Sequence, residues 1–169
     1  GYYSPMIDWQ VQEGDSDSTA TLVLSIDPGK PVRVSSRTVR IKGEAASDEK
    51  FTASLPAKPA EGDILDHGEY ANLRDTIQTR ARRRGYFDGT FVTHKLVVDP
   101  AARTAKIELV YDSGQRYRLG DVIFEEGHWF ETDLLNRFVT FEPGTPYHAD
   151  EIAKLNNDLQ NSGYFRGVE

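Results

Sequence analysis

The sequence predicts an α+β fold in which one strand-helix-helix-strand-strand unit is repeated in tandem. The first observation is a triplet of glycine, tyrosine and a second aromatic residue, which occurs at 1–3, 85–87 and 163–165. The triplets stand 84 and 78 residues apart, a long period of the kind that marks repeated supersecondary units. The second observation is an apolar stripe of helical spacing ahead of two triplets. The third is a glycine turn after each of two pairs of strand-like runs.

Strand-like runs come first in each copy. Two pairs of them follow the first two triplets, at residues 5–11 with 19–26 and 90–98 with 105–111. Each pair ends in a glycine turn, and a further run follows each turn, at 32–43 and 117–127. Arg33 and Arg118 occupy equivalent places, four residues after their turn glycines. Two unrelated loops would rarely agree this far, so these runs are predicted to be strands of one repeated unit.

A short helix is expected after that strand in each copy. The candidate segments are 47–55 and 132–138, with Ser47 and Thr132 as N-caps, because a hydroxyl oxygen can accept a hydrogen bond from a free N–H of the first turn.

A second, longer helix is expected before each triplet. Its apolar positions have spacings of three and four, at Tyr70, Leu73 and Ile77 and at Ile152, Leu155 and Leu159. Asp66 and Glu69 are spaced like a capping box at the start of the earlier helix. The distance from loop glycine to triplet glycine is 23 residues from Gly62 and 19 from Gly144, so the earlier helix should be about one turn longer.

These repeats predict three segments. Residues 1–30 are the last two strands of a first unit, 31–113 form a complete second unit, and 114–169 are a third unit without its last two strands. The chain is therefore expected to be a piece of a longer protein. Because the first segment contains what the third lacks, one hypothesis is that residues 1–30 of one molecule complete the third unit of another, head to tail.

Composition excludes several classes of function. A net charge of −7, from 27 acidic and 20 basic residues, argues against a general nucleic-acid surface. The absence of cysteine excludes disulfides, thiol catalysis and cysteine-ligated metals. No apolar run approaches the ~20 residues that a membrane helix needs.

Candidate catalytic and ligand groups have simple structural interpretations. Arg80, Arg82, Arg83 and Arg84 end a predicted helix, where cations interact favourably with the helix dipole and remain solvated. The histidines show no metal spacing; they are His67, His94, His128 and His148. No acidic pair, phosphate loop, serine elbow or zinc pattern is present. The sequence therefore predicts no enzyme activity, no cofactor and no metal.

Aromatic residues have two interpretations. Tyr86, Phe87, Tyr164 and Phe165 recur at one place per repeat, which favours packing over a ligand platform. Trp129 and Phe130 have no counterpart in the other copy and follow a glycine in an expected loop. This pair is a candidate docking spot, either between repeats or for a partner, and equally a cap over its own core.

The unit resembles polypeptide-transport-associated (POTRA) domains. The resemblance lies in the repeated unit, in Gly85-Tyr86-Phe87-Asp88, and in the Ser113–Arg118 turn that leads into Val122-Ile123-Phe124. These domains are periplasmic modules that precede the membrane barrel in the bacterial outer-membrane-protein assembly superfamily. The opening Gly1-Tyr2-Tyr3-Ser4-Pro5 resembles the TamA family within it, the outer-membrane subunits of the translocation and assembly module.

The resemblance implies a three-stranded mixed sheet with two helices on one face and a noncatalytic role. The first strand of the hairpin would lie at a sheet edge, where its backbone can pair with an extended polypeptide. In the second unit the expected edge residues are Phe91, Val92, Thr93, His94, Lys95 and Leu96. The alternative is that this strand is merely an edge, shielded by Lys95 and by a neighbouring domain.

Partners and location follow from the same resemblance. It implies a periplasmic segment of an outer-membrane protein that binds unfolded outer-membrane proteins such as autotransporters, a TamB-like partner anchored in the inner membrane, and its own C-terminal barrel. It implies neither nucleic-acid binding nor membrane insertion of this segment. The alternatives are the POTRA array of the essential barrel-assembly protein or of a two-partner secretion transporter. KH-like nucleic-acid-binding repeats share the strand-helix-helix-strand order, but the loops 56–63 and 141–146 lack the required Gly-x-x-Gly.

Overall fold

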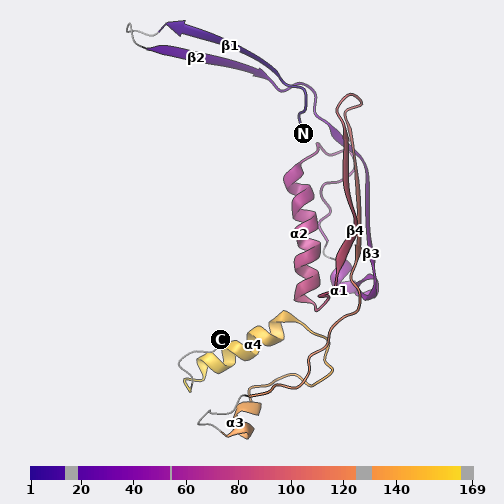
Figure 1. The fold of residues 1–169 in the computed structure, drawn as a ribbon, viewed down its shortest axis with the longest axis vertical. Helices are drawn as coiled ribbons and strands as arrows, with labels where there is room; N and C mark the ends of the chain where they lie inside the picture. The colour runs from indigo at the N-terminus through magenta and orange to yellow at the C-terminus, as the bar shows by residue number, and fades with distance from the viewer. Residues whose placement is uncertain (14–18, 54, 125–130, 165–169) are drawn as a thin grey trace. The chain divides into compact units, whose positions relative to one another are not determined.

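The structure is a computed structural model that describes residues 1–13, 19–53, 55–124 and 131–164 (Figure 1). Its contacts divide it into two compact units. The first contains Gly1–Val39, Pro56–Leu73 and Thr93–Leu109, and the second contains Arg40–Leu55, Arg74–Val92 and Val110–Glu169. The division crosses the central sheet and the longest helix, so each unit holds part of both. None of the helices in the described ranges is both long and apolar enough to cross a membrane.

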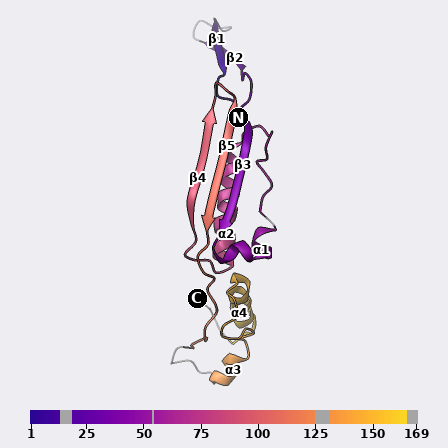
Figure 2. The same cartoon turned by 90° about the vertical axis from the view of Figure 1, so that its right-hand side faces the viewer.

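The central sheet has three strands, in the order β3-β5-β4 (Figure 2). They are β3 (Arg33–Lys42), β4 (Thr90–Asp99) and β5 (Thr104–Asp112), close to the predicted runs. In the middle strand, β5, buried and exposed side chains alternate from Ala105 to Leu109, because one face of the sheet packs on the core. The predicted three-stranded mixed sheet is confirmed. Its order makes β3 and β4 the two edges.

Two longer helices occupy equivalent places before their triplets. They are α2 (His67–Arg83), which runs along one face of the sheet (Figure 1), and α4 (Ala149–Asn161). Their lengths of 17 and 13 residues confirm the predicted extra turn of the earlier helix. Asp66 caps α2, since its carboxylate accepts a 2.7 Å hydrogen bond from the N–H of Gly68. Glu69 does not close a capping box in this structure; it lies 3.7 Å from the ammonium of Lys58.

The first short helix begins later than the sequence predicts. A 3-10 turn, η1 (Glu44–Ser47), precedes α1 (Glu49–Thr52). The predicted cap Ser47 is wrong, because its hydroxyl instead donates to the carbonyl of Glu44 within the 3-10 turn. Asp48 is the N-cap, and its carboxylate accepts a hydrogen bond from the N–H of Phe51.

The later segment also departs from prediction. Helix α3 (Thr132–Asn136) has Glu131 at its N-cap position, with no side-chain cap hydrogen bond, and the predicted cap Thr132 is its first helical residue. The predicted extension to residue 138 is not helical. Of the strand expected from residue 117, only a single bridge forms, between Arg118 and Pro146. A strand needs a partner, and among the described residues no second strand lies beside 117–124.

A separate hairpin, β1 (Met6–Glu13) with β2 (Ala20–Asp27), forms at the predicted place. Its register places six large apolar side chains on one face, and the pairs between them are polar except for Val23. These are the pairs Ile7 with Ile26, Trp9 with Leu24, and Val11 with Leu22. All six are between 56% and 64% exposed. The hairpin is therefore amphipathic, and its apolar face is open.

Each compact unit has its own buried side chains. In the first unit they are Val32, Val34, Leu65, Leu73, Ala105, Ile107 and Leu109. In the second they are Ala45, Phe51, Ile77, Ala81, Tyr86, Val110, Tyr111, Leu119 and Leu135. Leu73 and Ile77, from the predicted stripe of α2, are fully buried, whereas no residue of α4 is.

Candidate functional site

The candidate polypeptide-binding strand lies at one margin of the sheet. All six residues of the predicted edge, 91–96, belong to β4, and no further strand lies beyond β4 in the part of the chain that the structure describes. An edge strand pairs with the sheet on one side only, so the backbone N–H and C=O groups of its other side can accept an added strand.

Side chains along β4 alternate between the core and solvent. Phe91 faces inward, with its ring 5.0 Å from that of Tyr111 in an edge-to-face arrangement. Val92 and Val97 are 60% and 57% exposed. The alternation shifts at His94 and Lys95, which are both exposed. A shift of this kind places two neighbouring polar side chains on the surface, a common way to limit unspecific pairing at an edge.

The opposite edge, β3, is partly covered. The backbone of Val34 donates to the carbonyl of Asp63 at 2.9 Å and accepts from the N–H of Gly62 at 2.8 Å. Further along, the N–H of Arg37 donates to the carboxylate of Glu61 at 3.1 Å. Chain segments and a side chain therefore occupy the first half of the β3 edge. β4 is the other margin of the sheet, and the described residues place no further strand beyond it.

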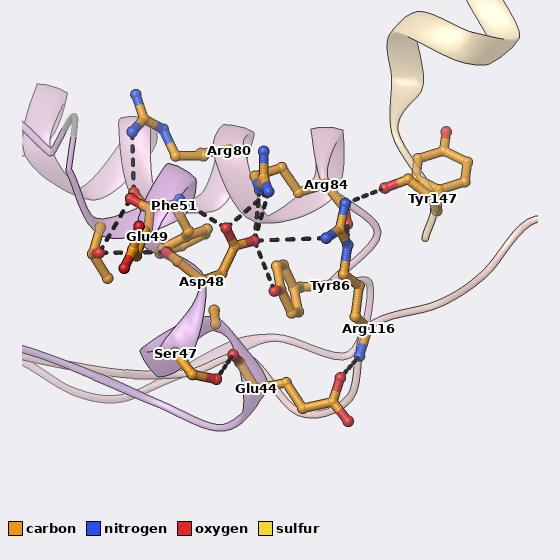
Figure 3. A network of polar contacts seen from close by, with 12 residues as sticks. Glu44, Ser47, Asp48, Glu49, Phe51, Arg80, Arg84, Tyr86, Arg116 and Tyr147 are labelled. Carbon is orange, nitrogen blue, oxygen red and sulfur yellow. Dashed lines mark hydrogen bonds and ion pairs between the residues drawn. The ribbon is translucent and has the colours of Figure 1, made fainter. Parts of the chain in front are cut away.

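A second polar feature surrounds the carboxylate of Asp48 (Figure 3). The guanidinium of Arg84 donates two hydrogen bonds to it, each 2.8 Å long, and the hydroxyl of Tyr86 donates a third at 3.0 Å. The N–H of Phe51 adds the cap bond at 3.2 Å. The side chains of Asp48 and Arg84 are only 11% and 12% exposed, so this ion pair is largely shielded from water.

Both ends of this cluster have altered acidity. Burial acts to raise the pKa of Asp48, but the hydrogen bonds from Arg84 and Tyr86 and the charge of Arg84 outweigh it, so the pKa is lowered from 3.8. Burial, together with the hydrogen bond to Asp48 and its charge, raises the pKa of Tyr86 to about 12. The folded state therefore holds an ionised carboxylate and a protonated tyrosine.

Arg116 extends the cluster into the segment after β5 (Figure 3). Its guanidinium donates to the carbonyl of Arg84 at 2.9 Å and to that of Tyr147 at 3.0 Å. Its backbone N–H donates to the carboxylate of Glu44 at 2.9 Å, and its side chain lies over the ring of Tyr86, 5.8 Å from the centroid. One side chain thus connects the end of α2 with the residue that leads to α4.

The other residues that the sequence analysis singled out do not gather at one site in the described part of the chain. The guanidinium of Arg80 donates to the carbonyl of Phe51 at 3.1 Å, and that of Arg83 pairs with the carboxylate of Asp150 at 2.7 Å. These contacts agree with a structural role for the arginine cluster. The expectation that all four side chains remain solvated is wrong for Arg84, which is 12% exposed because it pairs with Asp48. The proposed docking pair, Trp129 and Phe130, lies outside the described residues.

Sequence reasoning did not single out Asp48 or Arg116. The available signal was a difference between the copies: Arg116 corresponds to Pro31, and Arg84 corresponds to Ser162. Residues that depart from a repeat are those that the shared fold does not require.

The chain belongs to the POTRA family. The family, described as "Surface antigen variable number repeat", matches residues 33–114 and 117–169, which is more than half of the chain. The family is the one that the sequence resemblance named.

Solved structures show the same fold. A structure of POTRA domains 3–5 of BamA from Haemophilus influenzae aligns over 100% of this chain and 66% of its own, with 23% identity and a TM-score of 0.54. A structure of Haemophilus ducreyi BamA lacking POTRA domains 1–3 aligns over 81% of this chain and 25% of its own, with 17% identity and a TM-score of 0.59. This chain thus spans somewhat less than two thirds of the first of these proteins and a quarter of the second.

Proposed function

We propose that the chain is the periplasmic POTRA region of an outer-membrane protein that assembles or translocates other outer-membrane proteins. Its role is to bind partner and unfolded substrate polypeptides without catalysis. The observation that carries the proposal is the place of residues 91–96 in β4, the sheet edge opposite the partly covered strand β3. The family match to 33–114 and 117–169 supports the class of protein.

Binding occurs by addition of a strand to β4. An extended substrate segment pairs its backbone with the outer groups of β4, which depends little on substrate sequence. The exposed side chains of Val92 and Val97 offer apolar contact to alternate residues of that segment. Such indifference suits a module that receives many different unfolded chains.

Within the superfamily we assign the chain to a TamA-like protein, on the resemblance of residues 1–5. A TamB-like protein anchored in the inner membrane is then a partner, and autotransporters are among the substrates. The second candidate is an assembly protein of the BamA type, the protein described by both solved structures of similar fold. A pull-down of a TamB-like periplasmic segment by the purified chain separates the two, since the first candidate requires this binding and the second does not.

Proline scanning of the edge tests the strand-addition mechanism. Proline has no N–H to donate and is compatible with an edge only where that N–H faces outward. Because successive N–H groups of a strand point to opposite sides, His94→Pro and Lys95→Pro are made separately, and the variant that keeps helical circular dichroism and thermal midpoint is used. We expect it to bind a labelled peptide of alternating apolar and polar residues at least about tenfold more weakly, the loss of about 1.4 kcal/mol.

Arg40→Pro on the other edge is the matched control, since it makes the same change in β3. Binding should stay within twofold of the parent chain. If the folded proline variant at the β4 edge binds and crosslinks the peptide as the parent does, strand addition at this edge is wrong.

A further inference from the structure

The glycines of the first two triplets make the same backbone contact with the segment that follows. The carbonyl of Gly1 accepts a hydrogen bond from the N–H of Val32 at 2.7 Å, and the carbonyl of Gly85 accepts one from the N–H of Tyr117 at 2.8 Å. In both places, the donor is at the start of the next repeated strand segment. The triplet therefore ends one unit and holds the beginning of the next.

The last aromatic residue of each of these two triplets also contacts the following repeat, near the start of its second helix. The hydroxyl of Tyr3 is hydrogen-bonded to the ring of His67. Phe87 is packed edge-to-face between two rings, with centroids 5.3 Å from Tyr117 and 4.9 Å from Tyr147. The middle aromatic of the second triplet, Tyr86, instead points into its own core and is 2% exposed, whereas Tyr2 and Tyr164 at the same place are 51% and 54% exposed. In the second triplet, Tyr86 therefore packs within its own unit, whereas Phe87 contacts the following repeat.

Close approach requires glycine at the second of these places. Gly85 has a φ of 83°, and a Cβ on it would lie 2.7 Å from the Cβ of Tyr147. Backbone and side chain are therefore in direct contact where the two segments meet.

The second of these places has an additional element that the first lacks. Since Val32 and Tyr117 are equivalent, Pro31 stands where the later copy has Arg116. Proline offers no side-chain donor, whereas Arg116 makes two hydrogen bonds to backbone carbonyls and lies 3.8 Å from the carboxylate of Asp48. The shielded Asp48–Arg84 pair in turn fixes the end of α2 that presents one of those carbonyls.

We propose that Gly85, Phe87 and Arg116 form a locked joint that holds the segment beginning at Tyr117 against the end of α2, whereas the joint at residues 1–3, without an arginine, is a hinge. The partner surface of each triplet is the next repeat of the same chain. The locked joint also lies directly before β4, since only Asp88 and Gly89 separate Phe87 from the strand. It thereby fixes the approach to the candidate binding edge, although the joint itself does not depend on peptide binding.

Spin-label distances test the proposal directly. Because the chain has no cysteine, pairs of cysteines can be introduced at exposed positions without background labelling. Lys50→Cys with Lys154→Cys spans the locked joint, and Thr21→Cys with Lys106→Cys spans the hinge. Pulsed electron resonance should give a narrow distance distribution for the first pair and one at least about twice as broad for the second.

Arg116→Ala should broaden the first distribution to the width of the second, and Arg116→Lys, which keeps the charge but loses the two-pronged geometry, should broaden it partly. Arg82→Ala, at an exposed arginine of the same helix end, is the control and should leave it unchanged. Phe87→Leu serves as a second variant if the Arg116 change unfolds the segment, as shown by loss of α4 helicity. Equal widths for the two parent pairs, or an unchanged width in both folded joint variants, would overturn the proposal.

Discussion

Arg33 and Arg118 donate the same hydrogen bond at corresponding places in two repeats. A terminal nitrogen of each guanidinium lies 2.7 Å from a carbonyl oxygen, that of Gly62 in one case and that of Gly144 in the other. Each arginine also forms a single bridge to the residue two after that glycine. The sequence equivalence of the two arginines is thus a structural equivalence: both tie the start of a strand segment to the loop before the second helix.

The first prediction concerns this pair of arginines. Replacing either by alanine removes one hydrogen bond from a charged donor and should weaken local structure by about 1–2 kcal/mol. Native-state hydrogen exchange should detect the change at the amide of Val34 for Arg33→Ala and of Leu119 for Arg118→Ala, because both amides pair with the same loops. Loss of protection in the wrong copy, or in neither, would show that the two bonds are not equivalent supports.

The second prediction concerns pH. The pKa of Asp48 is lowered in the folded state, so its contribution to the free energy of unfolding is fully present above its ordinary pKa of 3.8 and is lost as pH falls below that value. Asp48→Asn should therefore reduce the free energy of unfolding by about 2 kcal/mol at pH 7, with a smaller difference in acid. Urea titrations of both proteins at several pH values between about 2 and 7, a range that brackets the pKa of an aspartate, measure this difference in the free energy of unfolding.

Tyr86 gives the opposite sign at alkaline pH. Its pKa is raised to about 12, so the stability that it contributes is present below its ordinary value of 10.0 and is lost as pH rises from there through 12. Tyr86→Phe, which keeps the ring against Phe51, should flatten this alkaline loss.

An Asp48→Asn curve parallel to the parent curve in acid would contradict the assignment of the acid-sensitive group.

The third prediction separates backbone strain from collision. Gly62→Ala introduces a side chain at a φ of 89° into open space, so only the left-handed conformation should matter, at about 1–2 kcal/mol. Gly85→Ala has a similar φ but also meets Tyr147, which adds about 1–3 kcal/mol. Chemical denaturation of both variants measures the difference. Equal losses would mean that Tyr147 moves away without cost and that the close approach is not needed.

The fourth prediction concerns the hairpin. Trp9 is 64% exposed on the apolar face of β1 and β2, so in a Trp129→Phe background its emission should resemble that of free tryptophan and be quenched readily by acrylamide. The head-to-tail hypothesis adds that this emission shifts to the blue as protein concentration rises, together with an increase in mass by light scattering. A constant spectrum at monomer mass would exclude that hypothesis.

Much of the fold could be predicted because the repeat supplies its own comparison. Two copies of one helical stripe and of one hairpin located α2, α4, β4 and β5, and the difference in loop-to-triplet distance gave the extra turn of α2. Local signals were weaker. Ser47 and Asp48 are both good caps, and only the 3-10 turn that takes up Ser47 decides between them.

The polar cluster could not be predicted in the same way. Asp48, Arg84 and Arg116 are distant in the sequence and meet only through tertiary structure. The strand expected from residue 117 failed for a related reason, since β pairing depends on a neighbour and not on the strand's own residues. Sequence pattern identifies what a segment is able to form, whereas contacts with other segments decide whether it does.

The partial covering of β3 makes the two edges of the sheet unequal as sites for pairing with another chain. Glu61 and the 62–65 stretch occupy the first half of that edge, which leaves a shorter length of β3 for pairing with another copy of the domain. Under the proposed strand addition, an extended polypeptide would therefore find its longest unbroken margin at β4 (Thr90–Asp99). Each such domain would then bind one extended chain by this route, because only one margin of its sheet is available along its full length.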